Sequence, residues 1–244
     1  MCRLLGYVSK APTSIKDFSG KSFDEFVKLS GVHKDSWGLS LIDSERKEVF
    51  KSVESAVESK NFDELAKRQK ASGGLLHFRW ASPGITVNEE NAHPFIYEDM
   101  SFIHNGALQP YDALLGAISP EVLKLRRGSG DSELFFLFAL TKVKELGFKA
   151  GIRSAIETIK GDYKYSSINS MFLNTDFLIV ISEHDPANRP SWTEPNYYEV
   201  RYRLDESGCV VASSGWDQSG WKLMPNHSAL IVDRKTMKSE LINL

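Results

Sequence analysis

Short apolar runs bounded by turn-forming residues occupy both ends of this chain, and two longer helical patterns lie between them. Residues 4–8 are apolar apart from one glycine, which predicts a strand buried on both faces. From residue 132 the apolar positions are dense enough for a helix that is buried on more than one side and ends at Gly147. A second helix is predicted over residues 152–161, with apolar residues at helical spacing and Gly161 as its end.

Two short helices and a series of short strands are predicted from the rest of the pattern. Ser22 and Glu25 have the spacing of a capping box, and Asn61 is a suitable N-cap, so helices are expected over 22–29 and 61–70. An exposed loop is expected at 185–195, which contains Pro and Asn. The predicted strands lie at residues 37–42, 48–53, 74–80, 101–104, 171–173, 177–182, 197–204, 210–213, 229–233 and 239–242.

The order of these elements indicates the fold class. A block of strands, then two helices, then more strands is typical of an α+β protein with antiparallel sheets, and not of a parallel doubly wound sheet. The sequence contains no internal repeat, low-complexity tract or linker that would divide it. We therefore expect one domain over residues 1–244.

Composition and charge exclude several classes of protein. The net charge of −2 argues against a nucleic-acid partner, since such proteins present basic patches. No apolar run is long enough to span a bilayer, and the N-terminus lacks the pattern of a signal peptide. The two cysteines, Cys2 and Cys209, form neither a disulfide framework nor a metal-binding spacing. We expect a cytoplasmic protein that uses no metal and no cofactor.

Cys2 is the first candidate for chemistry. Cys is small enough for an aminopeptidase to remove Met1, which would leave a thiol and a free α-amine on one residue. An α-amine has a reference pKa of about 7.7–8.0, so it is a usable base near neutral pH. A thiolate beside a base is an activated nucleophile. Taken alone, a Met-Cys start is also compatible with an ordinary thiol.

Three further clusters each allow a structural and a chemical interpretation. Arg79 offers a rigid fork for a carboxylate, but such a residue also forms surface salt bridges. Asn105 and Gly106 are a turn signal, and equally an oxyanion hole made of a side-chain amide and a backbone N–H. Asp131 is a suitable N-cap for the long helix, or a carboxylate that holds a substrate ammonium group.

Together these clusters describe one kind of substrate. A nucleophile, an oxyanion hole, an Arg for an α-carboxylate and an Asp for an α-ammonium fit the γ-amide of an L-glutamyl compound. Such a site requires no metal. His77 and His104 flank the candidate residues and are interpreted as structural histidines.

Several segments of the chain resemble the class II glutamine amidotransferases, which are N-terminal-nucleophile (Ntn) hydrolases with a terminal Cys. The resemblance spans residues 1 to about 135, and the segments occur in the family's order. They are Met1-Cys2-Arg3, Asp35-Ser36-Trp37-Gly38, His77 to Gly84, Asn91-Ala92-His93-Pro94-Phe95, His104-Asn105-Gly106 and Gly130-Asp131-Ser132-Glu133.

The resemblance implies a four-layer αββα sandwich with two stacked antiparallel sheets. It also implies that Cys2 is the nucleophile, that its own α-amine is the base, and that Asn105 and Gly106 form the oxyanion hole. The substrate-binding residues that it implies are Arg79 for the α-carboxylate, Asp131 for the α-ammonium, and Trp80 and Ser82 in the pocket wall.

Three functions remain open at this stage. The first is hydrolysis of the γ-amide of glutamine or of a γ-glutamyl compound through a thioester, because Met-Cys-Arg also resembles the stand-alone branch of the family. The second is a glutaminase subunit that passes ammonia to a separate synthase partner. The third is a binding module that has kept the fold and lost catalysis. The group beyond the γ-amide and the oligomeric state are not predicted.

Overall fold

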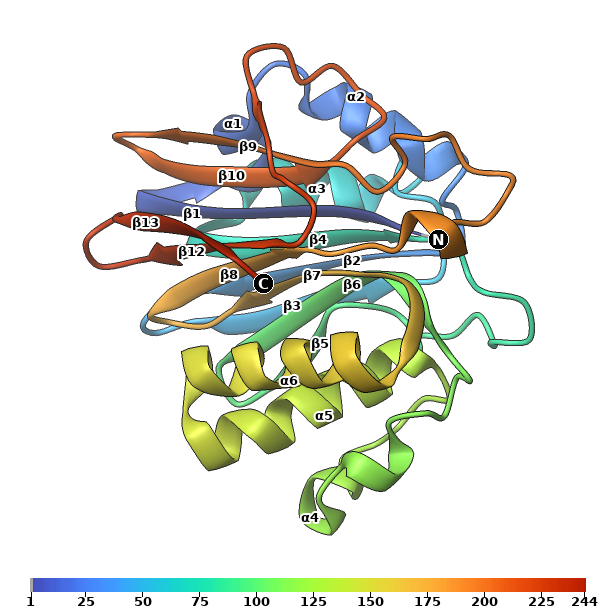
Figure 1. The fold of residues 1–244 in the computed structure, drawn as a ribbon. Helices are drawn as coiled ribbons and strands as arrows, with labels where there is room; N and C mark the ends of the chain where they lie inside the picture. The colour runs from blue at the N-terminus through green and yellow to red at the C-terminus, as the bar shows by residue number, and fades with distance from the viewer. Residues whose placement is uncertain (1) are drawn as a thin grey trace.

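Two antiparallel sheets lie face to face, and helices cover the outer side of each (Figure 1). The computed structural model describes residues 2–244, so the expected removal of Met1 concerns a residue outside the described part. The first sheet has the order β11-β9-β10-β1-β4-β2-β3 and the second the order β13-β12-β8-β7-β6-β5. The architecture is the αββα sandwich that the sequence predicts.

The strands of the first sheet are β1 (Arg3–Ser14), β2 (Ser36–Ile42), β3 (Lys47–Ser52), β4 (Lys70–Arg79), β9 (Val200–Asp205), β10 (Gly208–Ser213) and β11 (Lys222–Leu223). Those of the second are β5 (Phe95–Tyr97), β6 (Met100–Gln109), β7 (Lys164–Leu173), β8 (Phe177–Ser182), β12 (Ser228–Asp233) and β13 (Ser239–Asn243). The α-helices are α1 (Ile15–Ser19), α2 (Phe23–Lys28), α3 (Lys60–Arg68), α4 (Pro120–Leu123), α5 (Asp131–Leu146) and α6 (Phe148–Asp162).

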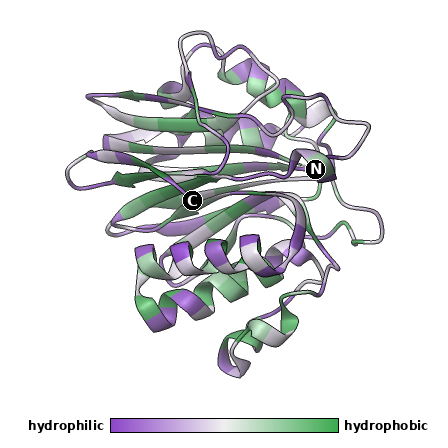
Figure 2. Ribbon diagram, in the orientation of Figure 1, coloured by the Kyte–Doolittle hydropathy of each residue, from purple (hydrophilic) through white to green (hydrophobic). Residues whose placement is uncertain are grey.

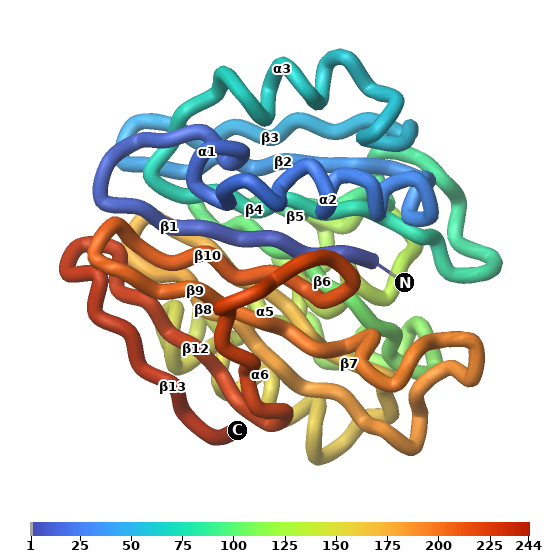
Figure 3. Tube along the Cα trace, turned by 90° about the horizontal axis from the view of Figure 1, so that it is seen from above, coloured from blue at the N-terminus to red at the C-terminus, as the bar shows by residue number. Residues whose placement is uncertain are grey.

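Alternation along the strands divides the apolar side chains among three cores. In β1, Leu5 and Tyr7 pack toward α1, α2 and α3, which lie over this sheet in Figure 3, whereas Leu4 and Val8 pack between the two sheets. A third core lies between the second sheet and helices α5 and α6. Because both faces of each sheet are buried, the central strands are largely hydrophobic, as Figure 2 shows.

The same alternation brings three predicted site residues to one end of the space between the sheets. Arg3 pairs with Phe78 across β1 and β4, so the next pair in this register is Cys2 and Arg79. Cys2 has the parity of Leu4, whose side chain lies between the sheets. Asn105 of β6 faces the same space from the second sheet, since it has the parity of Ile103.

Three predictions of how helices begin or end were wrong. Ser22 precedes α2 but makes no side-chain capping hydrogen bond, so the predicted capping box is absent there. The N-cap of α3 is Ser59 and not Asn61, and its hydroxyl accepts from the N–H of Phe62. Gly161 lies inside the last turn of α6, which runs on to Asp162.

The sequence expectations for Gly147 and Cys209 are confirmed. Gly147 ends α5 with a positive φ of 81°. Cys209 is fully buried in β10. Within residues 2–244, no helix is long and apolar enough to cross a membrane.

Candidate active site

Cys2 lies at the start of β1 with 8% of its surface exposed. Its backbone nitrogen donates a hydrogen bond of 2.8 Å to Oδ1 of Asn105. Its Sγ lies 3.9 Å from the carbonyl oxygen of Trp80. The thiol and the nitrogen expected to become the α-amine are thus both fixed by contacts from distant parts of the chain.

Asn105 and Gly106 do not form a turn, because β6 continues through both residues to Gln109. Asn105 is buried, and its Nδ2 has no hydrogen-bond partner within residues 2–244. An unpaired buried amide donor costs about 1–3 kcal/mol, so it needs an explanation such as a substrate oxygen. Gly106 has φ +154°, and a Cβ there would lie 1.9 Å from the carbonyl oxygen of Ser167. Only glycine therefore fits beside Asn105.

Arg79 ends β4 with 5% of its surface exposed. Its guanidinium donates to the carbonyl oxygen of Thr86 at 3.2 Å, and it forms no ion pair with any carboxylate of the described chain. Burial lowers its pKa, while Cys2, Asp35 and Asp131 act in the opposite direction. The surface salt bridge considered for Arg79 is therefore wrong, and the buried fork is available for a ligand carboxylate.

Asp131 is the first residue of α5, and the N-cap is Gly130. The alternative interpretation of Asp131 as the N-cap is thus wrong. Its Oδ2 accepts from the N–H of Leu108 at 2.9 Å. Burial raises the pKa of this carboxyl to about 6, against the opposing hydrogen bonds from backbone N–H groups. A cation bound beside Asp131 would stabilise its charged form.

Cys2, Gly106, Arg79 and Asp131 line one narrow pocket, and Asn105 adjoins it through its hydrogen bond to Cys2. Its free space is about 30 Å³, roughly enough for one or two waters, so a γ-glutamyl group enters only if part of the wall shifts. Trp80 and Ser82 also belong to the lining. The pocket is lined by Cys2, Arg79, Trp80, Ser82, Ile85, Asn91, His93, Phe95, His104, Gly106, Gly130, Asp131 and Ser132.

His93 is a pocket residue to which sequence reasoning gave no role. It is 3% exposed, its ring lies 4.1 Å from the ring of His77, and neither of its nitrogens has a hydrogen-bond partner in the part of the chain described. Burial lowers its pKa well below 6.5, so the ring is neutral. The sequence signal for it was its place in the Asn91–Phe95 segment, since the His77 ring that lies against it comes from β4.

The two histidines interpreted as structural differ from each other. His104 is satisfied on both sides, by the Ser132 hydroxyl at 2.9 Å and the Ser167 carbonyl at 3.1 Å. His77 uses only Nε2, which lies 3.1 Å from the carbonyl oxygen of His104. Burial lowers the pKa of His77 to about 3 and that of His104 to about 4. Neither ring is charged near neutral pH.

A larger cavity of about 470 Å³ adjoins the pocket and shares Phe95 with it. It contains none of the predicted site residues. Lys51 lines it, and burial lowers the pKa of this amine to about 8. Over residues 2–244, no group of three or more His, Cys, Asp or Glu side chains is placed to hold a metal ion.

A stacked pair of antiparallel sheets with a Cys at the tip of an inner strand defines an Ntn-type amidotransferase fold. Residues 1–170 match the class-II glutamine amidotransferases, and the chain belongs to this family. A probable glutamine amidotransferase of Saccharomyces cerevisiae, DUG3, is 29% identical over 97% of this chain and 83% of the relative. A putative glutamine amidotransferase of Escherichia coli, YafJ, is 28% identical over 71% of this chain and 69% of the relative.

Two further similarities are to a longer relative and to a solved structure. A glutamine–fructose-6-phosphate aminotransferase of Photorhabdus laumondii is 31% identical over 47% of this chain, which spans only 18% of that relative. A class-II glutamine aminotransferase domain protein from Silicibacter pomeroyi superposes with a TM-score of 0.69 at 19% identity, covering 100% of this chain and 99% of that one. The structural likeness supports the fold.

Proposed function

We propose that this protein hydrolyses the γ-amide of glutamine or of a γ-glutamyl compound through a γ-glutamyl thioester on Cys2. The observation that carries the proposal is that the Cys2 thiol, the buried guanidinium of Arg79 and the buried carboxyl of Asp131 line one pocket. Asn105 is held against Cys2 by a hydrogen bond, and its Nδ2 has no partner within residues 2–244. Membership of the family supports the same chemistry.

The proposed acylation step starts after removal of Met1. The new α-amine occupies the position in which the Cys2 nitrogen donates to Oδ1 of Asn105, so its lone pair is free to take the thiol proton. Sγ then attacks the γ-carbonyl carbon, and the carbonyl oxygen becomes an oxyanion. Nδ2 of Asn105 and the N–H of Gly106 would stabilise that charge. Collapse breaks the C–N bond, and the amine leaves with the proton from the α-ammonium group.

Hydrolysis of the thioester completes the cycle. The α-amine takes a proton from water, and the oxygen attacks the thioester carbon. Breaking the C–S bond restores the thiol and releases glutamate. Arg79 and Asp131 hold the α-carboxylate and the α-ammonium throughout, which keeps the carbonyl carbon within reach of Sγ.

Release of glutamate from glutamine and from γ-glutamyl amides tests the proposal. Cys2→Ala should abolish release, and circular dichroism should show an unchanged fold, because Ala adds no bulk and keeps the backbone nitrogen that bonds Asn105. Ala is no larger than Cys, so Met1 processing is preserved. Glutamate release by purified Cys2→Ala protein at the wild-type rate would refute the mechanism.

Intact-mass measurement tests the identity of the base. Active protein should lack Met1. Full activity with Met1 retained would exclude the α-amine as the base. Processed, folded protein that releases no glutamate from any of these substrates would instead favour a binding module without catalysis.

A second candidate is a glutaminase subunit that delivers ammonia to a separate synthase. It is favoured by the similarity to aminotransferases in which the matched region is a small part of a longer chain. Purification from the native host separates the candidates: a stoichiometric synthetase partner that raises glutaminase activity supports the subunit, and full activity of the isolated chain supports the stand-alone enzyme.

A further inference from the structure

A cluster of aromatic side chains adjoins the pocket that contains the thiol. Trp80 lines the pocket together with Cys2. The ring of Trp192 lies 4.9 Å from the ring of Trp80. The ring of Tyr197 in turn lies 6.3 Å from that of Trp192. The pocket wall therefore continues into an aromatic surface built from segments far apart in the sequence.

The back of this surface is fixed. His33 lies edge-on to Trp80 with centroids 5.8 Å apart, and its Nε2 lies 3.2 Å from the hydroxyl of Tyr197. The guanidinium of Arg3 lies 4.1 Å from the centroid of Tyr197 and donates to its carbonyl oxygen at 3.2 Å. The surface is thereby attached to the residue that follows Cys2 in β1.

The front of this surface faces solvent. Trp80 is 38% exposed and Trp192 is 56% exposed, whereas His33 and Tyr197 are buried. Indole rings present large apolar area at a small entropic cost, and so they are effective binding surfaces. Two partly exposed indoles in contact with each other, one of them lining the pocket, form such a surface.

The leaving group extends away from the buried groups that hold the glutamyl part of the substrate. Arg79 and Asp131 are both nearly fully buried, so the group beyond the γ-amide extends toward the exposed side of the pocket. Trp80 is the residue that lines the pocket and also continues outward to Trp192.

We infer that Trp80 and Trp192 form a subsite for the leaving group, and that the preferred substrates are γ-glutamyl amides whose amine carries an aromatic or other apolar group. This inference rests on the proposed function. The inference goes beyond the proposed function because it names the part of the substrate that glutamine lacks. It also assigns a role in specificity to Trp192, which lies outside residues 1–170, the region that matches the family.

Two synthetic amides test the subsite, because they differ only in the ring: γ-glutamylmethylamide and γ-glutamylbenzylamide. The wild-type protein should show kcat/KM at least about 10-fold higher for the benzylamide, the ratio expected for one well-packed apolar group. Trp192→Ala should remove this preference, and Trp192→Phe should keep most of it. Trp221→Ala is the matched control, since Trp221 makes an edge-to-face contact with Trp216 at 5.3 Å outside the pocket, and it should keep the preference.

The outcomes separate the two proposals. Equal kcat/KM for the two amides, or a preference that survives Trp192→Ala, would overturn the subsite while glutamate release continues. A preference lost equally in Trp221→Ala would overturn it as well, because the effect would not be local. If neither amide nor glutamine releases glutamate, the proposed function itself fails.

Discussion

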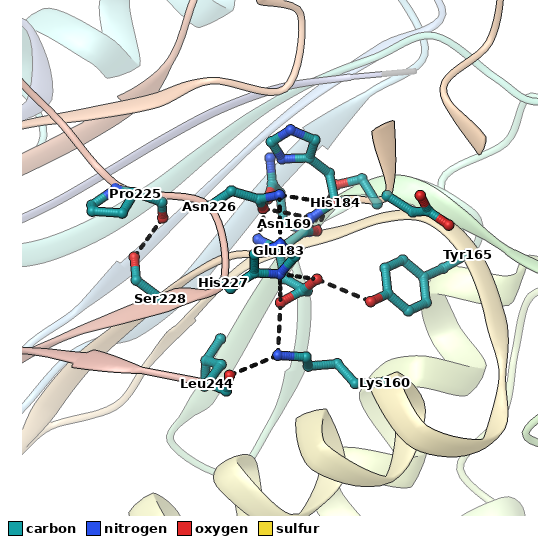
Figure 4. A network of polar contacts seen from close by, with 12 residues as sticks. Lys160, Tyr165, Asn169, Glu183, His184, Pro225, Asn226, His227, Ser228 and Leu244 are labelled. Atoms are coloured by element: carbon teal, nitrogen blue, oxygen red, sulfur yellow. Dashed lines mark hydrogen bonds and ion pairs between the residues drawn. The ribbon is translucent and has the colours of Figure 1, made fainter. Parts of the chain in front are cut away.

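Two buried carboxylates, Asp131 and Glu183, show how the reactive end of the molecule differs from a purely structural region. Glu183 is fully buried, and both of its oxygens are occupied (Figure 4). The hydroxyl of Tyr165 donates to it at 2.9 Å, Nδ1 of His227 lies 2.9 Å away, and Nζ of Lys160 lies 3.1 Å away. Asp131 accepts backbone N–H groups, and no ion pair reaches it from the described residues.

The difference extends to the neighbours of each carboxylate. Around Glu183, Oδ1 of Asn169 accepts the N–H of Glu183 at 2.7 Å, and one unpaired buried atom, Nδ1 of His184, lies next to it in the described chain. On the side of Asp131, both nitrogens of the pocket residue His93 and Nδ2 of Asn105, which holds Cys2, are buried without partners in residues 2–244. Unpaired buried polar groups cost stability, so these groups in and beside the pocket are candidates for contact with a ligand.

The largest expected effect is the difference in catalytic rate between variants of the two carboxylates. Asp131→Asn should lower kcat/KM for glutamine by about 10³-fold, which corresponds to about 4 kcal/mol, because a substrate ammonium loses its buried counter-charge. Glu183→Gln should stay within about 3-fold of wild type once folded. Initial rates of glutamate release measure both. A larger loss in Glu183→Gln than in Asp131→Asn would reverse the comparison.

The second effect concerns two asparagines that face each other across β6 and β7. Asn105 pairs in register with Asn169. Asn105→Ala should lower kcat by about 10²–10³-fold, as expected for an oxyanion-hole donor, with a small change in stability. Asn169 has both ends engaged, since its Nδ2 donates to the Tyr198 carbonyl at 2.7 Å. Asn169→Ala should therefore destabilise the fold and leave kcat within about 3-fold. Steady-state kinetics and urea denaturation of both variants check the pair.

The third effect is on stability and depends on pH. The folded-state pKa of Asp131, about 6, lies above the unfolded value, so its ionisation on raising the pH disfavours the folded state. Asp131→Asn should thus gain about 2–3 kcal/mol in the free energy of unfolding at pH 7.5, and less than about 1 kcal/mol at pH 4. Urea denaturation at the two pH values measures the gain.

Glu183→Gln is the control for that gain. It removes a charge whose partners are in place, so it should lose about 1–3 kcal/mol at pH 7.5. If Asp131→Asn also loses stability at pH 7.5, Asp131 is a structural residue like Glu183, and the contrast between the two regions fails.

The sequence predicted the strands that position the site because buried alternation is a local signal with a fixed period. That period placed Arg79 at the end of an inner strand, which burial and register confirm. The Asn105–Gly106 turn signal failed because β6 pairs onward with β7, and the close approach of Ser167 uses the glycine for packing. The local turn propensity of Asn105 and Gly106 is outweighed by packing against Ser167, 61 residues further along the chain.

The roles of His93 and Trp192 were beyond prediction for the same reason. His93 is recognisable as unusual only once His77 of β4 lies against it. Trp192 falls in a loop predicted only to be exposed, and its ring contact with Trp80 joins residues that are far apart in the sequence. Asn61 was the expected cap of α3, whereas the helix begins two residues earlier, after Ser59.

The smallest expected effect concerns His227, which is 57% exposed although it contacts Glu183. Its φ of +62° is tolerated by Asn, so His227→Asn removes the ring without adding backbone strain. The His227 ring is largely exposed, and Tyr165 and Lys160 still hold Glu183 without it, so the free energy of unfolding should fall by about 1 kcal/mol or less. Glutamate release should not change, because the remaining contacts of Glu183 and Asn169 separate His227 from the pocket. A 10-fold loss of kcat in His227→Asn would show that the Glu183 network supports catalysis, and the two regions would have to be treated as one.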